Sequence, residues 1–173
     1  MNVIMANAIS PNGLLAREDG NEDWLPSEGW QEFLADAKRF NNFVMGRETY
    51  ERVQELYPDY NFDNVETGYK IIVTRNQDFQ PPKGYIVVHS PQEALRFLEE
   101  KRIENALLVG GGKLNSQFLA QKLVNEIWIT ITPYIIGKGR PFIAPDDFDI
   151  RLDLFEHKEL SGGRLLTKYH CNY

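Results

Sequence analysis

The stretch LLVGGGKLNSQFL, residues 107–119, decides the fold class of this chain. A short apolar run ends in three consecutive glycines, and a helical pattern carrying Leu114, Phe118 and Leu119 follows. Backbone amides at the start of such a helix, with no Cβ to block approach, suit a pyrophosphate. The stretch is neither a GxGxxG fingerprint nor a GK[ST] loop. A phosphate-binding turn and a purely structural turn are therefore both compatible with it.

Apolar runs followed by helical patterns occur at several places along the chain. Apolar strand-like runs alternate with helical patterns that begin near Ser27, Gly46 and Ser90, which predicts a mostly parallel sheet with helices on both faces. Two runs around Ser161-Gly162-Gly163 predict an antiparallel C-terminal hairpin at the sheet edge. Ligands of such sheets bind beyond the carboxyl ends of the strands. The predicted strands cover residues 3–9, 43–45, 70–74, 85–88, 106–109, 126–134, 152–160 and 164–170.

Length and composition exclude several classes of protein. The 173 residues fit one domain spanning 1–173, and the net charge of −6 argues against nucleic-acid binding. A single cysteine, Cys171, excludes an intramolecular disulfide and a Cys-rich zinc site, so we expect no metal. The N-terminus lacks the features of a signal peptide, and no apolar run is long enough to span a membrane. These features predict a cytoplasmic protein without a membrane partner.

Two further strand ends carry groups suited to phosphate. In VMGRETYE, residues 44–51, Gly46 lies at a strand-to-helix junction and Arg47 offers a forked donor. The alternative is a helix-capping glycine beside a solvated arginine. In IVTRN, residues 72–76, a hydroxyl and a basic side chain end a strand. The IVTRN motif is a weak indication by itself, but it would place a third phosphate-binding group at the same sheet edge.

The segment EIWITITPYIIGKGRPFI, residues 126–143, combines a long strand with a loop of two glycines and two cations. The loop fits a turn that crosses a sheet edge, and equally a loop facing a substrate or a dimer partner. Ile127, Ile129 and Ile131 alternate with large side chains, more than a solvent-facing edge needs. This alternation predicts a homodimer.

These four segments, with AISPNGLLA at residues 8–16, resemble the dihydrofolate-reductase-like superfamily over nearly the whole chain. ITPYIIGKGRPF is similar to the reductase domain of the riboflavin-biosynthesis deaminase–reductases. The resemblance implies a dihydrofolate-reductase-like fold, a two-fold dimer, and hydride transfer from NADPH to a C=N or carbonyl carbon. The substrate would be a small pyrimidine- or pterin-like heterocycle, as for 5-amino-6-(5-phosphoribosylamino)uracil reductase.

Residues of this chain at the family's motif positions are expected to make the family's cofactor contacts. The resemblance implies that Gly46, Arg47 and Thr49 contact phosphates and ribose, and that Thr74, Arg75 and Lys113 hold the 2′-phosphate. The remaining implied contacts are Ala8, Leu14 and Leu15 beside the nicotinamide, Ser90 at the adenosine end, and Gly110, Gly111 and Gly112 at the pyrophosphate. Leu114 is a further implied cofactor contact.

Two departures from the family pattern affect the substrate side. Dihydrofolate reductases carry a carboxylate sixteen residues before the glycine of MGR, where this chain has Trp30, flanked by Glu28 and Glu32. Candidate proton donors are therefore Glu28, Asp23 or water. Trp24 and Trp30 would stack on a flat substrate, although the helical spacing of Trp30 also suits a core position. The zinc-deaminase motif HxE…PCxxC is absent, so the chain carries at most the reductase half.

The missing acid leaves two other functions open. One is a nucleotide-binding homolog without turnover. The other is a dihydrofolate reductase in which Glu28 replaces the displaced acid.

Overall fold

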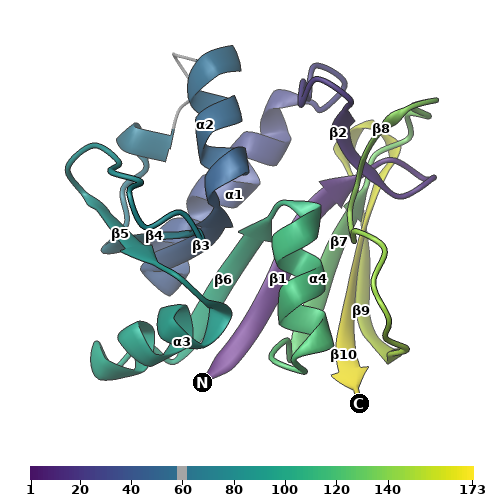
Figure 1. Cartoon of the computed structure of the whole chain (residues 1–173). Coiled ribbons are helices and arrows are strands. Elements are labelled where there is room, and N and C mark those ends of the chain that lie inside the picture. The colour runs from purple at the N-terminus through teal and green to yellow at the C-terminus, as the bar shows by residue number, and fades with distance from the viewer. Residues whose placement is uncertain (58–61) are drawn as a thin grey trace.

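The computed structural model describes residues 1–57 and 62–173, built around an eight-stranded sheet (Figure 1). The strands follow the order β5-β4-β3-β6-β1-β7-β10-β9. The first six in this order run parallel, and β10 and β9 pair antiparallel at one edge. The mixed α/β architecture of the sequence analysis is therefore confirmed, including its C-terminal hairpin. The strands are β1 (Asn2–Ile9), β3 (Asn42–Gly46), β4 (Tyr69–Val73), β5 (Tyr85–Val88), β6 (Asn105–Gly110), β7 (Glu126–Ile131), β9 (Arg151–Leu160) and β10 (Arg164–Asn172).

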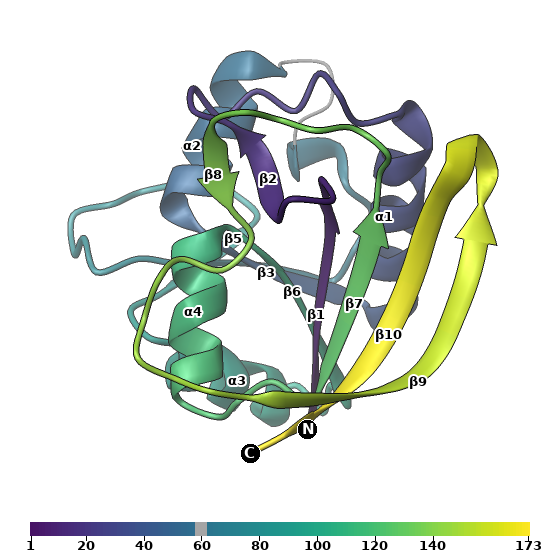
Figure 2. The same ribbon diagram turned by 90° about the vertical axis from the view of Figure 1, so that its right-hand side faces the viewer.

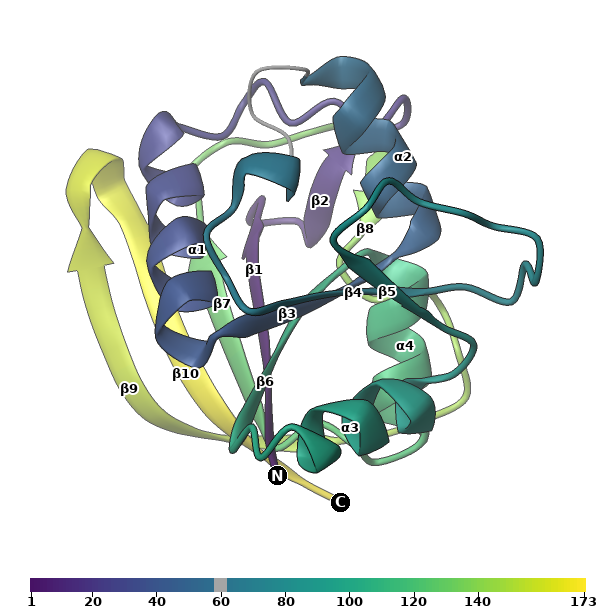
Figure 3. The same cartoon turned by 90° about the vertical axis from the view of Figure 1, so that its left-hand side faces the viewer.

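Helices cover both faces of the sheet, as Figures 2 and 3 show from opposite sides. On one face, α3 (Pro91–Glu100) and α4 (Gly112–Ala120) pack on a core that includes Val44 and Leu108. On the other, α1 (Ser27–Phe40) and α2 (Arg47–Leu56) pack on a core that includes Phe43 and Leu107. Neighbouring residues of one strand thus enter different cores, which explains why the parallel strands are apolar on both faces.

A small second sheet was not predicted from the sequence. It pairs β2 (Leu14–Arg17) with β8 (Gly139–Pro141) in antiparallel register. Four and three residues are too few to show a periodicity, so only the tertiary pairing reveals these strands. Their pairing places the GKGRPF segment beside the loop that follows β1.

The helix start at Ser90 differs in one detail from a capping box. The Ser90 hydroxyl accepts from the Glu93 amide at 3.2 Å, but the Glu93 carboxylate accepts from the His89 amide at 2.7 Å. The reciprocal bond therefore forms one residue before the cap.

None of the helices among the described residues is both long and apolar enough to cross a membrane.

Contacts within the chain explain why large side chains point to both faces of β7. The strand lies between β1 and β10, so it is not an edge. Ile127 is buried, and the Trp128 ring packs 5.9 Å from Phe40 with the Lys168 ammonium 4.2 Å above it. This alternation therefore gives no support for a dimer, and the expectation of one rests on the family resemblance.

One ion pair fastens the C-terminal hairpin to α1. The Arg164 guanidinium, whose side chain is 4% exposed, binds both carboxylate oxygens of Glu32 at 3.0 Å. It also donates to the Ser161 carbonyl at 3.2 Å. Forked geometry and burial make this contact stronger than a surface pair.

We expect Arg164→Ala to lower the free energy of unfolding by about 2 kcal/mol, because a charged donor and its hydrogen bonds are lost together. Lys38→Ala is the matched control, since its pair with Glu66 is exposed, and its effect should stay within about 0.5 kcal/mol. Urea titrations measure both changes. Equal effects would contradict the special role of the Arg164–Glu32 pair.

Candidate functional site

A cleft of about 680 Å³ opens beyond the carboxyl ends of the parallel strands. Its wall includes Asn7 of β1, Val73 of β4 and Val109 of β6, together with the first turns of α2 and α4. Leu15 and Ala16 of β2 and Arg140 and Pro141 of β8 close it on the other side. The cleft therefore occupies the sheet edge at which ligands of parallel sheets bind.

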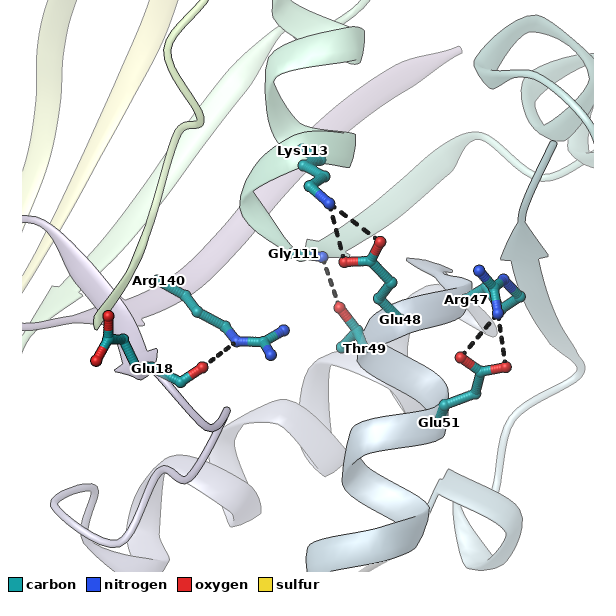
Figure 4. Close-up of polar contacts among 8 residues, drawn as sticks. All are labelled: Glu18, Arg47, Glu48, Thr49, Glu51, Gly111, Lys113 and Arg140. Carbon is teal, nitrogen blue, oxygen red and sulfur yellow. Dashed lines mark hydrogen bonds and ion pairs between the residues drawn. The ribbon is translucent and has the colours of Figure 1, made fainter. Parts of the chain in front are cut away.

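Two helix N-termini meet in this cleft. Gly46 precedes α2 and Gly111 precedes α4, and neither helix has a side-chain cap. The Gly111 amide donates to the Thr49 hydroxyl at 2.8 Å, which holds the two starts together (Figure 4). Uncapped amides and the positive ends of two helix dipoles favour an anion here.

The glycine triplet is required by close packing. A Cβ on Gly112 would lie 2.2 Å from the Pro141 carbonyl oxygen, and one on Gly111 would lie 3.0 Å from Thr49 Oγ1. Gly110 has a φ of +96°, in the region that favours glycine, and is buried beneath the turn. The triplet thus brings β8 and two helix starts within contact of one another.

Two of the cations assigned to the cofactor are paired with carboxylates in this structure (Figure 4). Arg47 binds Glu51 at 2.9 Å, and Lys113 binds Glu48 at 3.1 Å. Their side chains are one third to three quarters exposed, and exposed pairs of this kind contribute about 0–1 kcal/mol each. Both cations can therefore exchange their partner for a phosphate at small cost.

Arg140 is a cleft cation with a different environment. It extends from β8 toward α2, and its Nε donates to the Glu18 carbonyl at 3.2 Å (Figure 4). Among the described residues no carboxylate pairs with it. Its remaining donors face the space beside the helix starts.

The end of β4 forms another part of the cleft. Thr74 is buried, and its hydroxyl accepts from the Asn76 amide at 3.1 Å. The His89 ring nitrogen Nδ1 lies 2.9 Å from the Thr74 carbonyl. Arg75 lines the cleft and has no ion pair with any described residue. This end combines a hydroxyl, an imidazole and a free guanidinium.

Most of the cofactor positions inferred from the sequence come together in this cleft. They are Leu15, Gly46, Arg47, Thr49, Thr74, Arg75, Gly111, Gly112, Lys113 and Leu114. Ala8, Leu14, Gly110 and Ser90 do not line it. Ala8 and Leu14 lie in paired strands, Gly110 lies beneath the turn, and the Ser90 hydroxyl caps α3.

The structure does not place the two tryptophans in the cleft. Trp24 is 7% exposed, and its ring lies 6.2 Å from that of Tyr134. Trp30 packs in the core beneath α1, with ring centroids 5.1 Å from Phe33 and 5.9 Å from Phe62. The apolar face of α1 turns inward, which explains the correction for Trp30.

The two candidate proton donors also lie outside the cleft. Asp23 is exposed and paired with Arg17 at 2.6 Å, and Glu28 is exposed on the first turn of α1. Glu32, the other acid beside Trp30, is engaged by Arg164. None of these three carboxylates lines the cleft.

Several cleft residues had no signal in the sequence. Asn7 donates to the Val109 carbonyl at 3.1 Å, and Arg52, His89 and Glu22 join the wall from three different segments. Burial raises the pKa of Glu22 to about 7. Single polar residues without a motif become recognisable only when the fold brings them to one surface.

The sequence profile of the RibD C-terminal domain matches residues 1–166. The chain belongs to the RibD C-terminal domain family. A Bacillus subtilis protein, YwjB, is 28% identical over 78% of both chains, and Enterococcus faecium dihydrofolate reductase is 29% identical over 82% of this chain and 77% of its own. The family match supports a reductase-like role.

Two solved structures share the fold. A putative riboflavin biosynthesis protein from a Shewanella species superposes with a TM-score of 0.83 at 22% identity, covering all of both chains. Enterococcus faecalis dihydrofolate reductase, solved with NADP(H) and an inhibitor, superposes with a TM-score of 0.73 at 17% identity, over 99% and 97%. The RibD-domain and dihydrofolate-reductase-like resemblance of the sequence is confirmed.

We expect Gly112→Ala to lower the free energy of unfolding by about 1–3 kcal/mol, because its Cβ would overlap the Pro141 carbonyl. Gly137→Ala, in the same segment as Pro141, is the control, since nothing lies within 4 Å of its Cβ position. Thermal unfolding compares the two. Similar stability of both variants would rule out the tight contact.

Proposed function

We propose that this RibD-family chain is an NADPH-dependent reductase that transfers a hydride to a small pyrimidine- or pterin-like heterocycle. The observation that carries the proposal is the meeting of two uncapped helix N-termini at Gly46 and Gly111 in one cleft. Such a pair of termini suits the pyrophosphate of a dinucleotide.

The residues of the cleft fit this cofactor. The cradle at Gly111 and Gly112 exists only without a Cβ, and Thr49 lies in contact with it. Thr74, Arg75 and His89 supply donors for a 2′-phosphate, and Leu15 and Ala16 offer an apolar surface for a nicotinamide. The cofactor would supply the hydride, and the chain would orient it and exclude water.

Dihydrofolate reduction is the second candidate, favoured by the 29% identity to the Enterococcus faecium enzyme. Against it, Trp30 occupies the aromatic core and Glu28 is exposed outside the cleft. We therefore expect slow dihydrofolate reduction. Nicotinamide absorbance tests dihydrofolate, a dihydropterin and 5-amino-6-(5-phosphoribosylamino)uracil side by side, and no oxidation with any of them would contradict the reductase proposal.

We expect NADPH to bind about ten- to hundredfold more tightly than NADH, since a charge-assisted contact contributes roughly 1.5–3 kcal/mol. Arg75→Ala should remove most of this preference, because Arg75 is the cleft guanidinium at the β4 end. Arg96→Ala, on the exposed side of α3, is the control. Calorimetric titration measures all three proteins, and equal affinities in the unmodified chain would refute the 2′-phosphate assignment.

We also propose a homodimer, formed through the hairpin edge rather than through β7. β9 is the last strand of the sheet (Figure 2), and its residues are exposed over nearly its whole length. Leu154 is 53% exposed and Phe155 44%, and a second copy would cover both. Long edge strands with apolar side chains are normally covered.

We expect the unmodified chain to have twice the 20.0 kDa chain mass in light scattering at micromolar concentration. Leu154→Asp should shift it to the monomer mass, because a carboxylate on the covered face costs desolvation. Lys83→Asp, between β4 and β5 near the opposite edge, should leave the dimer intact. A monomeric unmodified chain would end the dimer proposal.

A further inference from the structure

One carboxyl group in the cleft has no role in the contacts described so far. Glu22 lies in the segment between β2 and α1 and lines the cleft with Leu15 and Ala16. Figure 1 shows β2 and β8 on one side of the molecule and β4 and β5 on the other. Thr74 and Arg75, which also line the cleft, directly follow β4. Glu22 is therefore at the end proposed for the nicotinamide, where the hydride acceptor must also lie.

Hydrogen bonds hold the backbone around Glu22. Its amide donates to the Tyr57 hydroxyl at 2.6 Å, and that hydroxyl donates to Asn21 Oδ1 at 2.6 Å. Its carbonyl accepts from the Leu25 amide at 2.9 Å. The segment also presses on α2, because a Cβ on Gly20 would lie 2.5 Å from Arg52 Cγ. The residue is thus positioned at the cleft wall without using its carboxyl group.

The Glu22 carboxyl itself is unpartnered. Within the described parts of the chain, no residue forms a hydrogen bond or an ion pair with it. By contrast, Asp23, the next residue, is bound to Arg17. A carboxyl held at a ligand cleft and left free of protein partners is available to a ligand.

Burial raises the pKa of Glu22 to about 7, so the carboxyl is protonated in acidic solution and about half protonated in neutral solution. A protonated carboxyl is a hydrogen-bond donor, whereas a carboxylate only accepts. Ionisable groups on the elements around Glu22 are Arg52 and Tyr57 from α2 and its C-terminus, Arg17 and Arg140 from the β2–β8 pair, and Asp19 and Asp23 from the same segment.

We propose that Glu22 is the catalytic acid that protonates the heterocyclic substrate during its reduction. The assignment rests on the proposed reductase function. The carbon of the substrate's C=N or C=O bond accepts the hydride with its electron pair, and the π electrons move to the nitrogen or oxygen. That atom takes the proton from the Glu22 carboxyl, so the substrate is reduced, NADPH is oxidised to NADP⁺, and the carboxylate regains a proton from water.

The pH dependence follows from the protonated form being active. Turnover should be full about one pH unit or more below the Glu22 pKa and should fall as the pH rises through that pKa, to about half its maximum near pH 7. Glu22→Gln keeps the size of the side chain but has no acidic proton. With the best of the three acceptors named above, its rate should be about 10²–10⁴-fold lower and should lack the fall near pH 7.

Glu18→Gln is the matched control, because this exposed carboxylate lies on the same segment outside the cleft wall. A control variant with the unmodified profile and a slow, pH-insensitive Glu22→Gln variant would support the assignment. Unchanged rate and profile in Glu22→Gln would overturn it.

A second readout needs neither cofactor nor substrate. Carboxyl ¹³C NMR of the apo chain, with Glu22→Gln used to assign the signal, should give a Glu22 titration midpoint near 7. A midpoint near the ordinary value of 4.5 would overturn the assignment even if turnover is found. Failure to bind NADPH in calorimetry would instead contradict the proposed function, and binding without oxidation by any of the three acceptors would overturn both.

Discussion

The parallel alignment of β3, β4, β6 and β1 is the constraint on which the cleft depends. Because these strands run in one direction, all their carboxyl ends reach the same edge, and the helices that follow β3 and β6 begin there. The contact between Gly112 and the Pro141 carbonyl then sets how closely β8 approaches that edge. A side chain at this glycine would force the two walls apart.

The charge pattern of the cleft reconciles an acidic chain with an anionic ligand. The chain has a net charge of −6, and Glu48 and Glu51 already neutralise Lys113 and Arg47. The helix termini at Gly46 and Gly111 are different, because their partial positive charge belongs to the backbone and no side chain caps them. We infer that the termini provide the permanent attraction, while the exposed pairs open to admit phosphate.

The aromatic core beneath α1 separates this chain from the pattern expected at its substrate side. Trp30, Phe33 and Phe62 pack as one cluster, so the position that carries an acid in dihydrofolate reductases here contributes to stability. Glu32 forms the ion pair with Arg164 that connects the C-terminal hairpin to α1. The acid that we propose for the substrate, Glu22, comes instead from the loop before α1 and lines the cleft wall.

The sequence by itself determined the order along the chain of the main-sheet strands and of the helices, the antiparallel hairpin and the glycine turns at Gly46 and Gly110–Gly112. Hydrophobic periodicity and glycine positions are local signals, and each of these features depends on neighbours within a few residues. It also marked Thr74 and Arg75, because they directly follow an apolar strand.

Only the tertiary structure decided which polar residues share the cleft. Glu22, Arg52, His89 and Arg140 come from four separate segments, and their proximity depends on sheet order and on the β2–β8 pairing. The same holds for Trp30, whose spacing fits a core face and a ligand face equally well. Burial and the pKa of Glu22 depend on distant residues, and no local pattern encodes them.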